Sequence, residues 1–80
     1  MANIRELQVK INDWETRYVL ESLSREMDRL KTINSSSDDE DEAADAGNDF
    51  MEISSLFESL SKDAVKVFGE HILDFSREQL

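Results

Sequence analysis

The sequence predicts an all-α protein that folds as an antiparallel hairpin of two long helices joined by an acidic linker. Two observations support this fold class. Apolar residues recur at helical spacing in two long stretches, and the 80 residues include no proline and only two glycines. Little in the chain therefore supplies the turns that an all-β fold needs. We expect one small domain over residues 1–80, because this length supports a single core at most.

The first helix is predicted over residues 3–33. Asn3 is the expected N-cap, and Glu6 completes a capping box three residues later. Apolar residues then follow at steps of three and four, at Ile4, Leu7, Ile11, Trp14 and Tyr18. Beyond these the spacing restarts in a second set, at Leu20, Leu23, Met27 and Leu30. At about 100° per residue the two sets lie on different sides of the helix. We favour a straight helix that contacts different neighbours at its two ends, so that one hairpin partner cannot cover both sets. The alternative is a bend near Val19 that turns both sets toward one core.

The connection is predicted over residues 34–48, which hold six acidic residues, no basic residue and no large apolar residue. A block of like charge is typical of a solvated linker. However, Ser37 and Glu40 form a capping box, and Gly47 stands where a glycine would end a helix. A short third helix over Asp38–Ala46 therefore remains open as an alternative.

The second long helix is predicted over residues 49–77, with Asp49 and Glu52 as its capping box. Its apolar stripe has near-heptad spacing and comprises Phe50, Ile53, Phe57, Leu60, Ala64, Phe68 and Phe75. Gly69 interrupts the stripe at a cost of about 1 kcal/mol relative to alanine. We favour one continuous helix through Gly69. The alternative is a helix that ends there, followed by a short one from Glu70.

A hairpin of this size exposes too much apolar surface, and the chain has no cysteine to stabilise it by a disulfide. We therefore predict that two copies pair into a four-helix bundle. The expected oligomer interface consists of aromatic residues, namely Trp14, Tyr18, Phe50, Phe57, Phe68 and Phe75. A three-helix monomer that uses the linker helix is the alternative.

The residue types argue against an enzyme, and no catalytic, cofactor or metal site is predicted. The chain has one histidine, His71, and no cysteine. A di-metal helical bundle needs Glu-x-x-His, but the position three residues before His71 is Phe68. The acidic run from Asp38 lacks the ligand register and the central glycine of an EF-hand loop.

The formal net charge of −10 argues against direct binding to nucleic acid or to an anionic membrane surface. No window is long and apolar enough to span a membrane, and residues 1–6 have no apolar core of a signal peptide. We expect a cytoplasmic protein whose charged partners carry a basic patch.

These features together predict a non-enzymatic protein that binds and regulates a partner protein, as inhibitors, antitoxins, immunity proteins and chaperones do. The expected partner-binding residues are apolar ones of the first helix and acids of the linker: Leu20, Leu23, Met27, Asp38, Asp39, Glu40, Asp41, Glu42 and Asp45. One alternative is a nucleic-acid mimic that presents a row of acids on the second helix, at Glu52, Asp63, Glu70, Asp74 and Glu78. Another is a structural homo-oligomer without an outside partner.

Overall fold

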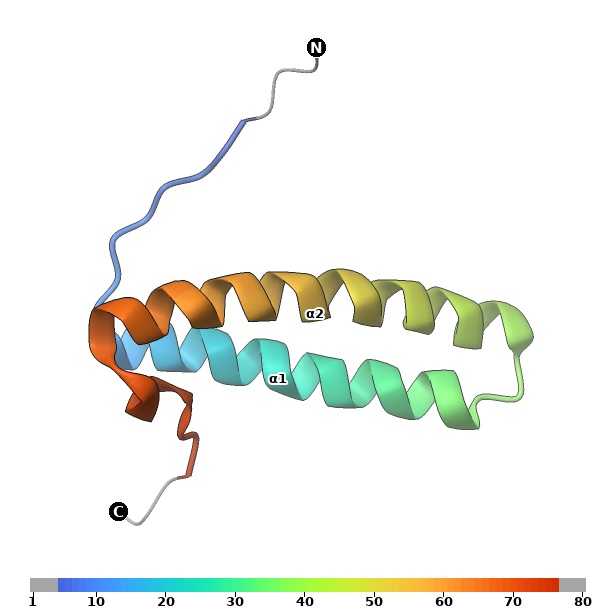
Figure 1. Ribbon diagram of the computed structural model, residues 1–80. Coiled ribbons are helices and arrows are strands. Elements are labelled where there is room, and N and C mark those ends of the chain that lie inside the picture. The colour runs from blue at the N-terminus through green and yellow to red at the C-terminus, as the bar shows by residue number, and fades with distance from the viewer. Residues whose placement is uncertain (1–4, 77–80) are drawn as a thin grey trace.

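Two long antiparallel helices pack side by side in the computed structural model, which describes residues 5–76 (Figure 1). Helix α1 spans Asp13–Ser36, and helix α2 spans Glu40–Phe68. A short 3-10 helix, η1, follows at Glu70–Leu73 and contacts both long helices. Residues 5–76 contain no strand. The predicted all-α hairpin is therefore confirmed, whereas several predicted helix boundaries are wrong.

Helix α1 begins later than predicted, at Asp13, and a capping box of Asn12 and Glu15 precedes and stabilises its first turn. The Asn12 side chain accepts a hydrogen bond from the Glu15 backbone N–H at 2.9 Å, and the Glu15 carboxylate accepts one from the Asn12 N–H at 2.8 Å. Residues 5–12 are not helical. Val9 and Ile11 are β-branched residues, which favour extended backbone. The predicted start, Asn3, lies outside the described residues.

Helix α2 begins earlier than predicted, at Glu40 rather than at Asp49. The Asp39 carboxylate caps it by accepting hydrogen bonds from the backbone N–H groups of Asp41 at 2.9 Å and Glu42 at 3.3 Å. An acidic first turn also suits the positive end of the helix dipole. The short helix that remained open for residues 38–46 is therefore the first part of α2, and residues 34–48 do not form a linker.

Helix α2 ends at Phe68 because Gly69 adopts a φ of 97°, which residues with side chains rarely adopt. The Gly69 N–H donates to the Val65 carbonyl at 2.9 Å and closes the last turn. The chain then folds back through η1, where Ile72 is only 2% exposed. The favoured continuous helix to residue 77 is wrong, and the alternative of a short helix from Glu70 is confirmed.

The core forms where α1, α2 and η1 meet, around Leu20, Ala64 and Ile72. Leu20 is 0% exposed, so the second apolar set of the first helix faces α2. Partly buried residues complete this cluster, namely Phe57, Leu60, Val65, Phe68 and Phe75. Leu7 and Ile11 of the first apolar set lie in the non-helical segment, whereas its last two members lie on α1. These two, Trp14 and Tyr18, are 53% and 50% exposed.

The two long helices approach closely at Gly47, and this contact gives a test of the α1–α2 register. The Asn34 amide Nδ2 donates to the Ala43 carbonyl at 2.7 Å, and a Cβ added to Gly47 would lie 2.7 Å from that nitrogen. Gly47→Ala gains about 1 kcal/mol of helix propensity but displaces a hydrogen bond of comparable strength. We expect a change in unfolding free energy within about 0.5 kcal/mol of zero.

In an Asn34→Ala background the same substitution meets no amide, and we expect Gly47→Ala to stabilise by about 1 kcal/mol. Urea unfolding of the four variants measures the coupling between the two positions. Equal effects of Gly47→Ala in both backgrounds would show that Asn34 and Gly47 do not touch.

Candidate protein-binding surfaces

An acidic tip, defined here as Asp38–Glu42 together with Asp45, surrounds the turn between the long helices. The Ser37 hydroxyl donates to the Glu42 carboxylate at 2.6 Å and accepts from the Asp39 N–H at 3.1 Å. Asp39 and Glu42 are therefore used to build the turn. The other four acids, Asp38, Glu40, Asp41 and Asp45, are exposed.

The acidic residues gather in one region of the structure, as the sequence predicted, but this region is ordered. The ion pairs of residues 5–76 are Glu21–Arg25 at 2.8 Å and Glu26–Arg29 at 2.6 Å, both within α1. None of the six acids of the tip is part of these pairs. The tip therefore presents uncompensated negative charge at one end of the hairpin, on a capped helix terminus rather than on a loose linker.

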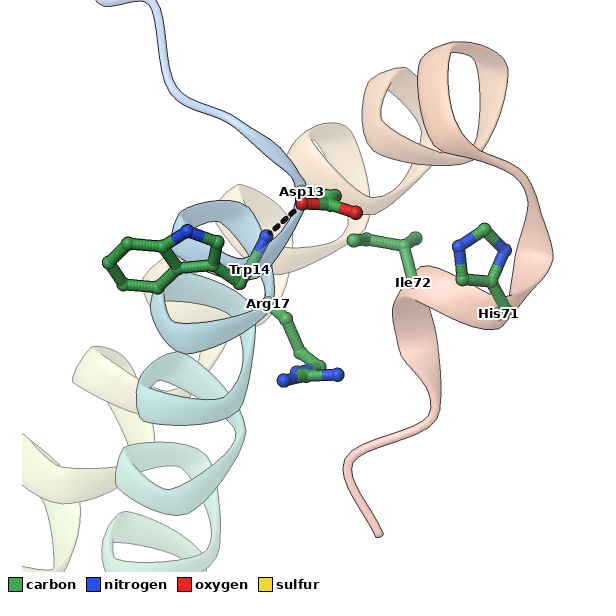
Figure 2. Close-up of a pocket in the computed structure, with 5 residues that line it drawn as sticks. All are labelled: Asp13, Trp14, Arg17, His71 and Ile72. Atoms are coloured by element: carbon green, nitrogen blue, oxygen red, sulfur yellow. Dashed lines mark hydrogen bonds between the residues drawn. The ribbon is translucent and has the colours of Figure 1, made fainter. Parts of the chain in front are cut away.

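The opposite end of α1 carries an exposed aromatic pair. The Trp14 and Tyr18 rings meet edge to face, with centroids 5.8 Å apart and an interplanar angle of 86°. Figure 2 shows the Trp14 indole extending away from Ile72 and His71 of η1. Trp14 and Tyr18 were predicted as part of an interface between two chains, and in the single chain they lie on the outer side of α1.

A small hollow of about 50 Å³ lies between the start of α1 and η1 (Figure 2). It is lined by Asp13, Trp14, Arg17, His71 and Ile72. The Asp13 carboxylate accepts a hydrogen bond from the Trp14 N–H at 2.7 Å, so it supports the first turn of the helix. The volume is below that of a typical small-molecule site.

Two larger, open hollows lie along α2 beside the N-terminal segment, residues 5–12. One, of about 360 Å³, has Val9 and Ile11 on one side and Leu60 and Val67 on the other. The second, of about 500 Å³, lies between Leu7 and Leu60. Sequence reasoning missed these hollows, because it placed residues 5–12 in a helix. The alternation of Leu7, Val9 and Ile11 with polar residues was the available signal for an extended segment.

The structure separates the residues predicted to form the oligomer interface. Phe57, Phe68 and Phe75 pack against the core of the same chain. Phe50 is half-buried on the part of α2 that precedes this cluster. Within one chain the structure therefore does not bring the phenylalanines together with Trp14 or Tyr18 on one outer surface.

The residues predicted to bind a partner also fall in different environments. Leu20 is wholly buried, so the expectation that it is exposed is wrong; it is the residue of α1 that contacts Ala64 and Ile72. Leu23 and Met27 are half-buried. The predicted acids of the linker form the acidic tip, at the far end of the hairpin from the core cluster.

Two carboxylates have a lowered pKa because they accept hydrogen bonds. Arg29 donates to both oxygens of Glu26, at 2.9 and 2.6 Å, and these bonds lower the pKa of Glu26. The Ser76 hydroxyl and N–H donate to one Asp74 oxygen at 2.7 and 3.0 Å and lower the pKa of Asp74. A lowered pKa means that the folded state binds the proton more weakly than the unfolded state.

The contribution of Glu26 to stability is thus present above its ordinary pKa of 4.5 and is lost as the pH falls through its folded pKa. We expect the NMR titration midpoint of Glu26 to lie below 4.5, and Arg29→Gln to raise it. Arg25→Gln, which removes the neighbouring cation paired with Glu21, is the control and should leave it unchanged. If the pKa of Glu26 rose equally in both variants, its lowered value would come from the total charge of α1 and not from the hydrogen bonds with Arg29.

The fold and these surfaces define a class of protein: a small all-α helical hairpin with an acidic tip at one end and an exposed aromatic pair near the other. Comparison of the chain with protein-family models, curated proteins and solved structures finds no match. Within residues 5–76, no helix has the length and apolar character needed to cross a membrane. The same residues hold no group of three or more His, Cys, Asp or Glu side chains arranged to bind a metal ion.

Proposed function

We propose that the protein is a non-enzymatic binding protein that occupies and regulates a partner protein carrying a basic patch. The acidic tip is the observation that supports this function. All six acids of the tip are exposed, and they gather at the turn end of two helices that hold them in place. Charges on a rigid element attract a partner of opposite charge and speed its association. Because the element is already ordered, binding costs little conformational entropy.

The test is affinity capture from lysate of the source cells, with a variant that neutralises the tip while preserving the fold. This variant carries Asp38→Asn, Glu40→Gln, Asp41→Asn and Asp45→Asn. It leaves Asp39, the N-cap of α2, and Glu42, the partner of Ser37, unchanged. We expect about tenfold less of the captured partner and a weaker dependence of capture on salt.

The matched control removes the same number of charges from exposed acids elsewhere, through Asp28→Asn, Glu52→Gln, Glu58→Gln and Glu70→Gln. We expect the control to capture the partner nearly as well as the wild-type chain does. Equal loss in both variants would show that only total charge matters. Undiminished capture by the tip variant would overturn the proposed role of the tip.

Nucleic-acid mimicry is the second candidate function, and the geometry favours it less. A mimic needs a rigid row of carboxylates, and the predicted row would have run along one continuous helix. Glu52 and Asp63 lie on α2, but Glu70 lies on η1 and Asp74 beyond it, because α2 ends at Gly69. A captured partner that DNA displaces in competition would favour mimicry.

We also propose that two chains associate, and exposed apolar side chains on the long helices support this step. Trp14 of α1 is 53% exposed, and Met51 and Val67 of α2 are 70% and 73% exposed. Covering such side chains with a second copy would remove apolar surface from water. Sedimentation equilibrium should give twice the mass of one chain. A single-chain mass at 100 µM would contradict dimerisation and leave the proposal on the tip untouched.

A further inference from the structure

The backbone of the N-terminal segment has no hydrogen-bond partner in its own chain before Asn12. Residues 5–12 contain no helix, turn or bend, and they run away from the end of the hairpin as an extended chain (Figure 1). Among the described residues, backbone hydrogen bonds begin at Asn12, whose carbonyl accepts from the Thr16 N–H at 2.9 Å. The N–H and C=O groups of residues 5–11 are therefore available to pair with another strand.

The side chains of this segment alternate as those of a strand with one apolar side do. The odd-numbered residues Leu7, Val9 and Ile11 are apolar, whereas the residues between them, Gln8 and Lys10, are polar. In an extended chain these two sets lie on opposite sides. Leu7 is 88% exposed and Val9 is 63% exposed, so the hairpin of the same chain does not cover them. Such a segment suits edge-to-edge pairing with a second strand.

The segment is complementary to a second copy of itself in the antiparallel orientation. When Gln8 of one copy stands opposite Gln8 of the other, Glu6 of each copy stands opposite Lys10 of the other copy. Leu7 then stands opposite Val9 on the apolar side of the pair. Opposite charges and apolar residues that face each other directly across two strands stabilise the pairing.

Other arrangements of the two segments lose this match. A shift by one residue places apolar residues opposite polar ones. A shift by two residues keeps the apolar residues together, but it places Glu6 or Lys10 opposite Gln8 and removes both charge pairs. Parallel pairing in register sets Glu6 against Glu6 and Lys10 against Lys10, and like charges directly opposite each other are destabilising. Charge complementarity therefore selects one register, which a two-fold axis at Gln8 generates.

A two-stranded ribbon is only marginally stable by itself in water, so its apolar side needs a neighbour. Helix α2 lies beside the segment, because Val9 and Ile11 line a hollow together with Leu60 and Val67. Pairing adds Leu7 and Val9 of a second copy to the same apolar side. The ribbon therefore has apolar residues of a helix next to it in each copy.

We propose that the N-terminal segments of two copies pair as an antiparallel two-stranded ribbon, with Glu6 of each copy opposite Lys10 of the other. The proposal rests on the proposed dimerisation and identifies the segment that makes the contact. Both charges are available for this pairing, since the ion pairs within residues 5–76 lie in α1. The paired segments replace the phenylalanines as the contact, because Phe57 and Phe68 pack against the core of their own chain.

The test reverses the two charges, singly and together, in the full chain. Glu6→Lys opposes lysines at two places in the ribbon, and Lys10→Glu opposes glutamates at two places. By sedimentation equilibrium at low salt, we expect each single reversal to raise the dimer dissociation constant about tenfold. The double variant Glu6→Lys/Lys10→Glu restores both charge pairs and should dimerise within about threefold of the wild-type chain.

Arg5→Glu is the matched control for Lys10→Glu. It changes the net charge by the same amount, but position 5 faces Ile11 in the proposed register. We expect it to change the dissociation constant less than about threefold. An equal loss in Arg5→Glu and Lys10→Glu would mean that net charge, and not this register, governs association, and it would overturn the ribbon.

An equimolar mixture of the Glu6→Lys chain and the Lys10→Glu chain separates pairing between copies from effects within one chain. Each chain repels its own copy, but the mixed pair has lysines opposite glutamates at both places, so a heterodimer should form nearly as tightly as the wild-type dimer. A mixture that does not recover, or a dimer that both single reversals leave unchanged, overturns the ribbon and leaves dimerisation standing. A wild-type chain that is monomeric at about 100 µM overturns both. Circular dichroism of each variant checks that α1 and α2 persist.

Discussion

Leu20→Ala is expected to destabilise the protein by about 3 kcal/mol, within the range of 2–5 kcal/mol found for such core truncations. Leu20 is 0% exposed and contacts both Ala64 of α2 and Ile72 of η1. Alanine at this position removes buried methyl groups and leaves a void that three separate elements would have to close. An 80-residue domain has a total stability of about 4–12 kcal/mol, so this single change removes a large part of it.

The melting temperature should therefore fall by more than about 10 °C. It must be measured at one fixed chain concentration, because dimerisation would make the melting temperature depend on concentration. Met51→Ala is the control, since Met51 is 70% exposed on α2, and it should change the unfolding free energy by about 0.5 kcal/mol or less. If both variants melt alike, Leu20 does not face α2, and its predicted role as an exposed partner contact would become tenable again.

The sequence predicted the core side of α2 because its signal repeats over many turns. Phe50, Ile53, Phe57 and Leu60 all fall on the half-buried side of the helix. Helix geometry fixes which residues share one side, so a long apolar stripe identifies the side of the helix that faces the core. The all-α class followed from the same periodicity.

The ends of the helices could not be predicted in the same way. More than one position matched the sequence pattern of a helix start or a helix end equally well. Asn3 with Glu6 and Asn12 with Glu15 both satisfy the capping-box pattern, and the pattern alone does not rank them. Gly47 and Gly69 were both candidate helix ends. Packing decides between them: Gly47 stays inside α2 beside Asn34, whereas Gly69 ends it and lets Ile72 reach the core.

The acidic tip was predictable from composition, but the extended conformation of residues 5–12 was not. Charge content is a property of the sequence and survives an error in secondary structure, so the acids from Asp38 to Asp45 were identified despite the wrong linker. The hollows beside residues 5–12 depend on two segments that meet in space, the extended N-terminal segment and α2. Because Leu7 was assigned to a helix, the sequence did not predict these hollows.

Ile72→Ala is expected to destabilise the protein by about 2 kcal/mol, at the lower end of the range for buried aliphatic residues. Ile72 is 2% exposed and is the buried residue of η1. The destabilisation by Ile72→Ala has an upper limit that the destabilisation by Leu20→Ala does not have. The reason is that η1 can separate from the hairpin while α1 and α2 stay packed. The cost cannot exceed the free energy that docking of η1 contributes.

The signature of Ile72→Ala is therefore local opening rather than general unfolding. Two backbone hydrogen bonds report it: Ile72 N–H to the Gly69 carbonyl at 3.2 Å and Asp74 N–H to the His71 carbonyl at 3.0 Å. We expect amide hydrogen exchange at positions 72 and 74 to accelerate at least tenfold, while amides in the middle of α1 and α2 keep most of their protection.

Leu73→Ala is the matched control in the same short helix, since Leu73 is 38% exposed, and exchange at these amides should change little. The double variant Leu20→Ala/Ile72→Ala should lose less than the sum of the two single effects, because both side chains belong to one cluster. Additive losses would mean that η1 docks independently of Leu20. Coupled losses would show that Leu20 of α1 and Ile72 of η1 stabilise one shared core.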